Sequence, residues 1–112
     1  RQHLDLGAEG EDRAAAWYSE KGYTVLARNW RCADGELDLV VCKDGIVVFC
    51  EVKTRATDRW GLPAEAVNHT KQRRLRHLAV LFMQANRVRS RELRFDVASV
   101  LPSSVTVIEA AF

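Results

Sequence analysis

Apolar and polar positions recur along the chain with two periods, and these divide it into helices and strands. An alanine-rich segment stops just before Gly22 and predicts a helix from about Leu6 to Lys21. A second segment has apolar residues at alternating steps of four and three, and it predicts a helix from about Asn68 to Asn86. The stripe predicted to face inward on this second helix consists of Lys71, Leu75, Leu78, Phe82 and Ala85.

Five further segments are predicted to be strands because they are rich in β-branched and aromatic residues. The second and third are apolar on both faces, which is typical of central strands covered on both sides. The resulting order, α-βββ-α-ββ, predicts a single domain over residues 1–112. Its fold class is an α/β sandwich with a mixed sheet of about five strands between helices. The strands are Tyr23–Asn29, Leu37–Lys43, Ile46–Thr54, Leu93–Leu101 and Val105–Ala110.

The turn between the second and third strands fixes which side chains face one another. Asp44-Gly45 is a strong signal for a two-residue hairpin turn. In that register Asp38 lies opposite Glu51, and Glu36 lies opposite Lys53. Because side chains alternate along a strand, all four then point to one face. A slip of one residue would separate the two central carboxylates.

Two facing carboxylates within apolar strands repel each other and are costly to bury. A divalent cation, Mg²⁺ or Mn²⁺, bound by Asp38 and Glu51 removes both problems. Lys53 lies two residues beyond Glu51 and can orient a metal-bound water or neutralise a phosphate. This set predicts hydrolysis of a phosphodiester by an activated water. The alternative is a buried ion-pair network, with Lys53 between Glu51 and Glu36 and with Asp38 held by backbone donors.

Two other acidic residues occupy notable positions. Glu11 shares a face of the first predicted helix with Ala14, Ala15 and Tyr18, so it lies at the rim of the core or points into the site. Asp96 interrupts an apolar strand and is predicted to be structural, bonded to its neighbour Arg94 or to backbone.

The net charge of +2 conceals a strong asymmetry. Residues 53–94 carry 11 Lys or Arg and 3 Asp or Glu, whereas the remainder carries 6 and 12. Such a distribution fits a protein that meets a polyanion beside a carboxylate site. A mobile loop and a solvated helix face are the alternatives for the basic residues. The candidate nucleic-acid contacts are Arg55, Arg59, Trp60, Lys71, Arg73, Arg74 and Arg76.

Several classes of protein are disfavoured. Cys32, Cys42 and Cys50 form no CxxC pair, which argues against a disulfide framework and against a zinc site. No apolar run approaches the roughly 20 residues of a membrane helix, and no signal-peptide pattern is present. We therefore expect a cytoplasmic protein with reduced thiols and no membrane partner.

The combined motifs resemble those of the YraN family of predicted nucleases. That family belongs to the PD-(D/E)XK, or restriction-endonuclease-like, superfamily and is similar to archaeal Holliday junction resolvases. The central motifs are GELDLV at residues 35–40 and VFCEVKTR at residues 48–55. The likeness continues in Gly10-Glu11, Gly22-Tyr23, Asn29-Trp30-Arg31, GLPAEAV at residues 61–67, Lys71, Arg74-Leu75 and RFDV at residues 94–97.

The resemblance implies a restriction-endonuclease-like fold and a role for each matching residue. Asp38 takes the position of the metal-binding aspartate, although Leu37 stands before it where the superfamily has proline. Glu51 and Lys53 take the acidic and lysine positions of the (D/E)XK element. Glu11 matches the first-helix glutamate that assists the metal.

The function implied is a Mg²⁺- or Mn²⁺-dependent endonuclease acting on DNA rather than RNA, on branched, recombination or repair intermediates. A homodimer, as in resolvase-like relatives, is compatible with the size of the chain. Two alternatives stay open: a non-catalytic nucleic-acid-binding module of the same fold, and a protein-interaction subunit.

Overall fold

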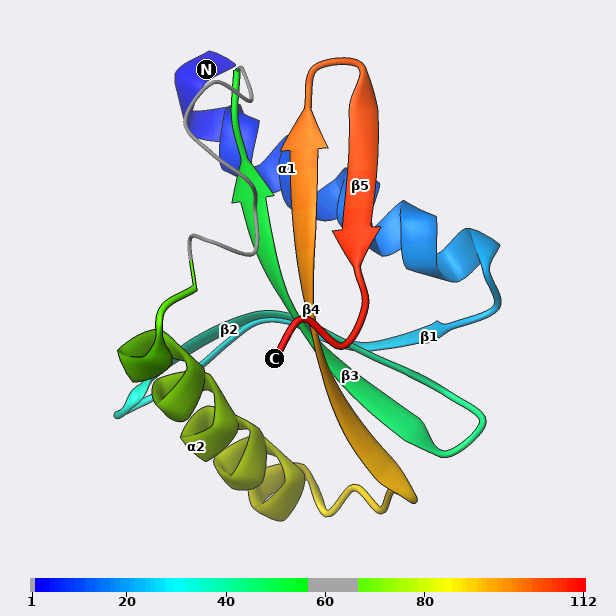
Figure 1. Cartoon of the computed structure of the whole chain (residues 1–112), viewed down its shortest axis with the longest axis vertical. Helices are drawn as coiled ribbons and strands as arrows, with labels where there is room; N and C mark the ends of the chain where they lie inside the picture. Colours follow the sequence, from blue (N-terminus) through cyan, green and yellow to red (C-terminus); the bar gives the residue numbers. More distant parts are fainter. Residues whose placement is uncertain (1, 57–66) are drawn as a thin grey trace.

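The computed structural model describes the backbone of residues 2–56 and 67–112, with side chains from Gly7 onward. Figure 1 shows the elements in the order that the sequence predicts, α-βββ-α-ββ. No helix in these residues is long and apolar enough to span a membrane. The elements are α1 (Gln2–Glu20), β1 (Thr24–Cys32), β2 (Gly35–Lys43), β3 (Ile46–Thr54), α2 (His69–Asn86), β4 (Glu92–Leu101) and β5 (Ser104–Ile108).

The five strands form one sheet in the order β1-β2-β3-β4-β5. β3 and β4 are parallel and the other neighbours are antiparallel, so the sheet is mixed. α1 packs on one face, and α2 packs on the other (Figure 1). The predicted α/β sandwich is confirmed, and its arrangement is consistent with a restriction-endonuclease-like fold.

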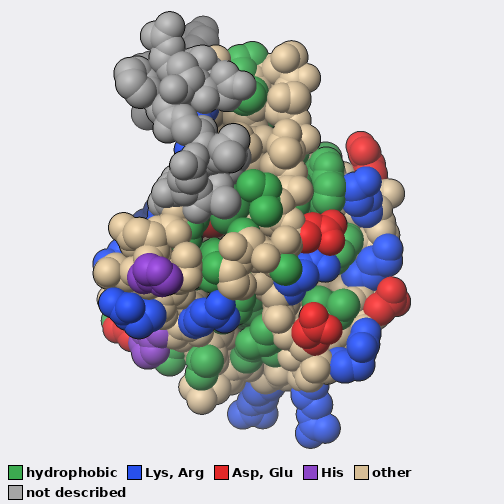
Figure 2. Space-filling model, viewed as in Figure 1, with side chains coloured by type: hydrophobic (Ala, Val, Ile, Leu, Met, Phe, Trp, Pro, Cys, Tyr) green, Lys and Arg blue, Asp and Glu red, His purple; other side chains and the backbone are tan. Residues whose placement is uncertain are grey.

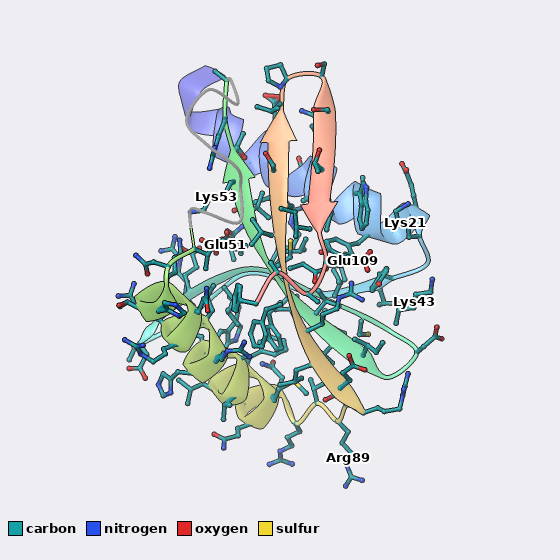
Figure 3. The ribbon with its side chains drawn as sticks, viewed as in Figure 1. Lys21, Lys43, Glu51, Lys53, Arg89 and Glu109 are labelled. Atoms are coloured by element: carbon teal, nitrogen blue, oxygen red, sulfur yellow. The ribbon has the colours of Figure 1, made fainter. Side chains whose placement is uncertain are left out.

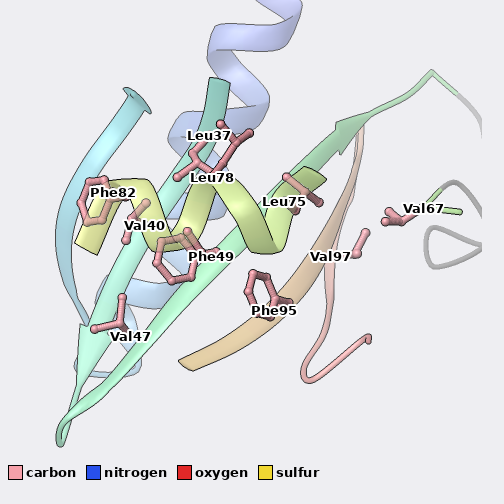
Figure 4. Close-up of a cluster of buried hydrophobic side chains, with 11 residues drawn as sticks. Leu37, Val40, Val47, Phe49, Val67, Leu75, Leu78, Phe82, Phe95 and Val97 are labelled. Atoms are coloured by element: carbon pink, nitrogen blue, oxygen red, sulfur yellow. The ribbon is translucent and has the colours of Figure 1, made fainter. Parts of the chain in front are cut away.

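The face under α2 holds the larger aromatic core (Figure 4). Leu75, Leu78 and Phe82 are buried against the sheet, as the sequence predicts. The prediction that Ala85 faces inward is wrong, because that residue is exposed and Ala79 takes the inward place. The true stripe follows steps of three, four and seven from Leu75, which is the 3.6-residue period of a straight helix.

The face under α1 is built on small residues that let the helix lie close to the sheet. Ala14, Ala15 and Tyr18 are buried, which confirms the predicted face. Gly10 touches β3 so closely that a Cβ there would lie 1.9 Å from Thr54 Oγ1. α1 begins at Gln2 rather than at Leu6, since no helix breaker precedes that leucine.

The β2–β3 hairpin has the predicted turn. Asp44 and Gly45 both have positive φ angles, 53° and 81°, as a type I′ turn requires. The register that follows from this turn holds from Lys43–Ile46 to Leu39–Cys50.

Three predicted strand boundaries differ from the structure by two residues or more. β1 does not end at Asn29, because a local irregularity there, with a φ of 52°, is followed by renewed pairing up to Cys32. β2 begins at Gly35, two residues before the predicted start, because it pairs with this extension of β1. β5 ends at Ile108, just before Ala110 adopts a left-handed conformation that cannot continue a strand.

Candidate active site

Asp38 and Glu51 lie on the α2 side of the sheet, just beyond the last recorded pair of the β2–β3 ladder, Leu39–Cys50. At this point Asp38 Oδ2 accepts a hydrogen bond from the Val52 backbone N–H at 2.9 Å. The side chain thus takes an amide that a continuous ladder would have paired with main chain. Both acidic residues line the same pocket, so the predicted convergence is confirmed although the ladder ends at Leu39–Cys50, before the predicted pair of Asp38 with Glu51.

The second predicted pair, Glu36 opposite Lys53, is wrong as a strand pair. Glu36 pairs instead with Arg31 of β1, and their side chains form an exposed ion pair at 3.4 Å. The reason is that β2 stays hydrogen-bonded to β1 over these residues after its pairing with β3 has ended. Glu36 still lines the pocket that contains Asp38.

Backbone irregularity also surrounds Asp38 on its other side. In the β1–β2 ladder Arg28 pairs with Leu39 and Trp30 pairs with Leu37. Asn29 lies between these pairs, is not paired in the ladder, and has a left-handed backbone conformation. The Asn29 side-chain amide donates to Glu11 Oε1 at 2.9 Å. This contact brings Glu11 of α1 close enough for its charge to act on Asp38. A strained, unpaired position next to a carboxylate is typical of functional sites.

Two lysines from different elements converge on Glu51, which is only 8% exposed. Lys53 Nζ lies 3.4 Å from Glu51 Oε2, and Lys71 Nζ makes a closer contact with the same oxygen. Lys71 is held at the start of α2, where its backbone N–H donates to the capping side chain of Asn68 at 2.9 Å. Figure 3 shows Glu51 and Lys53 on β3 beside this end of α2.

The two carboxylates have opposite electrostatic environments. Burial and the negative charge of Glu51 raise the pKa of Asp38 to about 7. Burial would also raise the pKa of Glu51, but its contacts with Lys71 and Lys53 outweigh burial and lower it. Burial and the neighbouring Lys71 lower the pKa of Lys53. One carboxylate is therefore firmly ionised at neutral pH while the other stands close to protonation.

A pocket of about 280 Å³ opens over these groups. It brings both acids to the same space as two basic side chains of α2, which suits a hydrated cation with an anionic ligand. Its lining residues are Asp34, Gly35, Glu36, Asp38, Glu51, Lys71, Arg74, Leu75 and Leu78.

The donor set fits a hydrated magnesium ion. Within the described residues, no three His, Cys, Asp or Glu side chains lie together as a closed metal cage. Mg²⁺ needs none, because it keeps several waters and is commonly bound through one or two carboxylates. A cation between Asp38 and Glu51 would also relieve the repulsion that raises the pKa of Asp38. Glu11 is engaged by Asn29, and its role as a metal ligand stays a prediction.

The predicted nucleic-acid contacts fall in different places. Arg74 lines the pocket with Lys71, and Arg73 is exposed on α2. Arg76 instead lies over the rings of Phe95 and Phe112, with its guanidinium carbon 4.8 and 5.3 Å from their centroids.

Arg55 lines a separate pocket of about 300 Å³ that also contains Arg13 of α1. Arg59 and Trp60 lie outside the described residues. The face in Figure 2 carries Lys and Arg side chains over α2 and also across from it, where acidic side chains lie among them. Of the predicted contacts that the structure describes, Lys71 and Arg74 are the ones brought to the acids.

Asp96 is structural, as predicted, but its partners were only partly foreseen. It is fully buried, and its carboxylate accepts two hydrogen bonds from Arg94 and one from the Ala110 backbone N–H. The Tyr18 hydroxyl donates a fourth at 2.6 Å. No local signal in the sequence links α1 to β4, so this contact could not be found from the pattern.

Asn29 and Asn68 were missed as contributors to the site. A polar residue that can adopt a left-handed conformation within an apolar strand is the signal that could have identified Asn29. Asn68 before a helical segment is a capping signal, here fixing the residue that reaches Glu51.

Comparisons with known proteins give a consistent result. The model of a family described as "Uncharacterised protein family UPF0102" matches residues 10–100. The chain is 46% identical to a UPF0102 protein of Clavibacter michiganensis, over 96% of this chain and 95% of the relative. It is 52% identical to a UPF0102 protein of Mycolicibacterium gilvum, over 85% of this chain and 79% of the relative. It is 41% identical to a UPF0102 protein of Syntrophus aciditrophicus, over 88% of this chain and 78% of the relative.

Proposed function

The chain belongs to the UPF0102 family, the YraN family that its motifs resemble, and we propose that it is a divalent-metal-dependent endonuclease. It hydrolyses phosphodiester bonds, in DNA rather than RNA. The observation that carries this proposal is the convergence of Asp38 and Glu51 from neighbouring strands on one pocket, with Lys53 beside them. A module that only binds nucleic acid has no need of two carboxylates that repel each other within one pocket.

Asp38 and Glu51 would hold Mg²⁺ or Mn²⁺, with Glu11 as a further contributor from α1. When bound, such an ion supplies Lewis-acid polarisation of a phosphate and activates water. Lys53 contributes its Nζ, which lies 3.4 Å from Glu51 Oε2 at the edge of this site. Its lowered pKa favours proton exchange at this nitrogen, and its charged form neutralises a phosphate oxygen.

The substrate is held by basic side chains on the α2 side of the pocket. Arg74 and Lys71 line the pocket itself, and Arg73 extends the positive charge along the helix. Arg55, Arg59 and Trp60 follow Lys53 in the chain and are proposed to contact the same nucleic acid. Branched, recombination or repair intermediates are the proposed DNA substrates, and a homodimer would place two such sites on two strands.

The test is cleavage of a panel of single-stranded, nicked, flapped and four-way DNA with Mg²⁺, Mn²⁺ or EDTA. We expect metal-dependent cleavage of at least one substrate, reduced about a hundredfold or more in Asp38→Asn and Glu51→Gln. Glu20→Gln, an exposed glutamate at the end of α1, is the control for loss of one acidic charge and should cleave normally. A folded wild-type protein that cleaves nothing with either metal would contradict the proposal.

A non-catalytic nucleic-acid-binding module is the second candidate, favoured by the exposed Arg73 and by the net charge of residues 53–94. It predicts binding that weakens steeply with salt and is unchanged in Asp38→Asn, without cleavage. Binding and cleavage measured on the same samples separate the two candidates.

A further inference from the structure

The proposed site contains one more cation than its chemistry requires. Lys53 already supplies an ammonium group two residues beyond Glu51 on the same strand. Lys71 brings a second from α2, and the two converge on the same oxygen atom, Glu51 Oε2. The proposed contact of Lys71 with the substrate does not by itself account for its contact with Glu51.

The two lysines differ in their relation to the pocket. Lys71 lines it together with Asp38 and Glu51, whereas Lys53 is not among the lining residues. The Lys71 side chain is 33% exposed and the Glu51 side chain 9% exposed. Lys71 thus occupies space from which a hydrated cation would approach the two acids, and it covers the Glu51 oxygen with positive charge.

An ammonium group and a divalent cation cannot share this oxygen without strong repulsion. Close like charges in a partly buried site repel much more strongly than in water. A metal ion that coordinates Glu51 through Oε2 must therefore move the Lys71 ammonium away. The backbone of Lys71 is fixed by the Asn68 cap, so the side chain moves while the helix stays in place.

We infer that Lys71 is a resident counter-ion of the metal site, which neutralises Glu51 in the metal-free protein and is displaced from Oε2 when a divalent cation binds. The inference rests on the proposed function, because it presumes that Asp38 and Glu51 bind a metal. Lys71 acts through Glu51 as a positioning residue. It prevents an unpaired buried carboxylate in the absence of metal, and it lowers the affinity of the site for metal.

The test is Mn²⁺ binding by calorimetry, without nucleic acid and at fixed pH and salt. In Lys71→Met we expect Mn²⁺ affinity to rise about fivefold or more, because the competing charge is gone. Arg89→Met is the control, since it removes one positive charge from an exposed position in the loop that follows the same helix. Its affinity should stay within about twofold of wild type. Lys71→Gln keeps a polar donor and should show the same rise in Mn²⁺ affinity as Lys71→Met. It serves as the test variant if the methionine variant does not fold.

The outcomes distinguish the inference from the proposed function. If wild type binds Mn²⁺ and both Lys71 variants bind it equally or more weakly, the counter-ion role is overturned while the metal site stands. A lower Tm without a gain in affinity also overturns it, because that pattern marks a purely structural ion pair. If wild type and all variants bind no Mn²⁺, the proposed metal site fails and the inference fails with it.

Discussion

Replacing Asp38 with asparagine should stabilise the metal-free protein at pH 8. Burial next to Glu51 raises the pKa of the Asp38 carboxyl in the folded chain to about 7 from an ordinary value of 3.8. Folding therefore favours its protonated form, and ionisation at high pH opposes folding. Asparagine has nearly the same shape, carries no charge, and keeps an oxygen that can accept the hydrogen bond from Val52 N–H.

The magnitude follows from the shift in pKa. Below the unfolded-state pKa the carboxyl is protonated in both states and carries no penalty. As the pH rises from there towards the folded-state pKa, stability is lost, and above it the loss is complete. A pKa raised from 3.8 to about 7 corresponds to an upper limit of about 4 kcal/mol, and solvent that reaches the half-buried carboxyl reduces this penalty. We expect Asp38→Asn to gain about 1–3 kcal/mol at pH 8 and to lose this advantage towards pH 4.

The assay is urea unfolding in EDTA at several pH values, with Glu51→Gln as the internal contrast. Glu51→Gln should lose about 1–3 kcal/mol at pH 8, because Lys71 and Lys53 are left without their counter-charge. Opposite signs for two adjacent acid-to-amide changes are the signature expected. Destabilisation of Asp38→Asn at pH 8, or a change of both variants in the same direction, would contradict the reasoning. That reasoning holds that the charge of Asp38 opposes folding and that the charge of Glu51 is neutralised by its two lysines.

Three further predictions follow from particular contacts. Gly10→Ala should destabilise the protein by about 1–3 kcal/mol, measured as a fall in Tm, because its Cβ would meet Thr54 Oγ1 at 1.9 Å. Asp96→Asn should cost about 3–5 kcal/mol in urea unfolding, because Arg94 loses its buried counter-charge; a change below 1 kcal/mol would contradict this. Mg²⁺ should raise the Tm of wild type at pH 8 in a concentration-dependent manner and leave the Tm of Asp38→Asn unchanged, as differential scanning fluorimetry can measure.

The sequence predicted most of the fold because its signals are local. The Asp44-Gly45 turn determines a register, and that register carries the apolar alternation of β2 and β3 onto the correct faces. The same turn brought Asp38 and Glu51 to one side of the sheet. Periodicity likewise located α1 and α2, with errors where an edge residue such as Ala85 was assigned to the buried stripe.

The rest depends on interactions between distant segments, which no local pattern contains. The end of the β2–β3 ladder before Asp38 follows from a side chain taking the Val52 amide. Lys71 could be placed on a helix, but its approach to Glu51 depends on how α2 docks on the sheet. Such contacts require the angles and distances between elements, and these are set by the packing of the whole core.

The most direct test of the central claim is anomalous diffraction from crystals grown with Mn²⁺. The account predicts one ordered ion on the α2 side of the sheet, with a carboxylate oxygen of Asp38 and one of Glu51 each at about 2.1 Å. It also predicts that Lys71 Nζ has left Glu51 Oε2. Density for the ion elsewhere, or none in crystals with Mn²⁺ far above the calorimetric Kd, would contradict the claim that these two strands form a metal site.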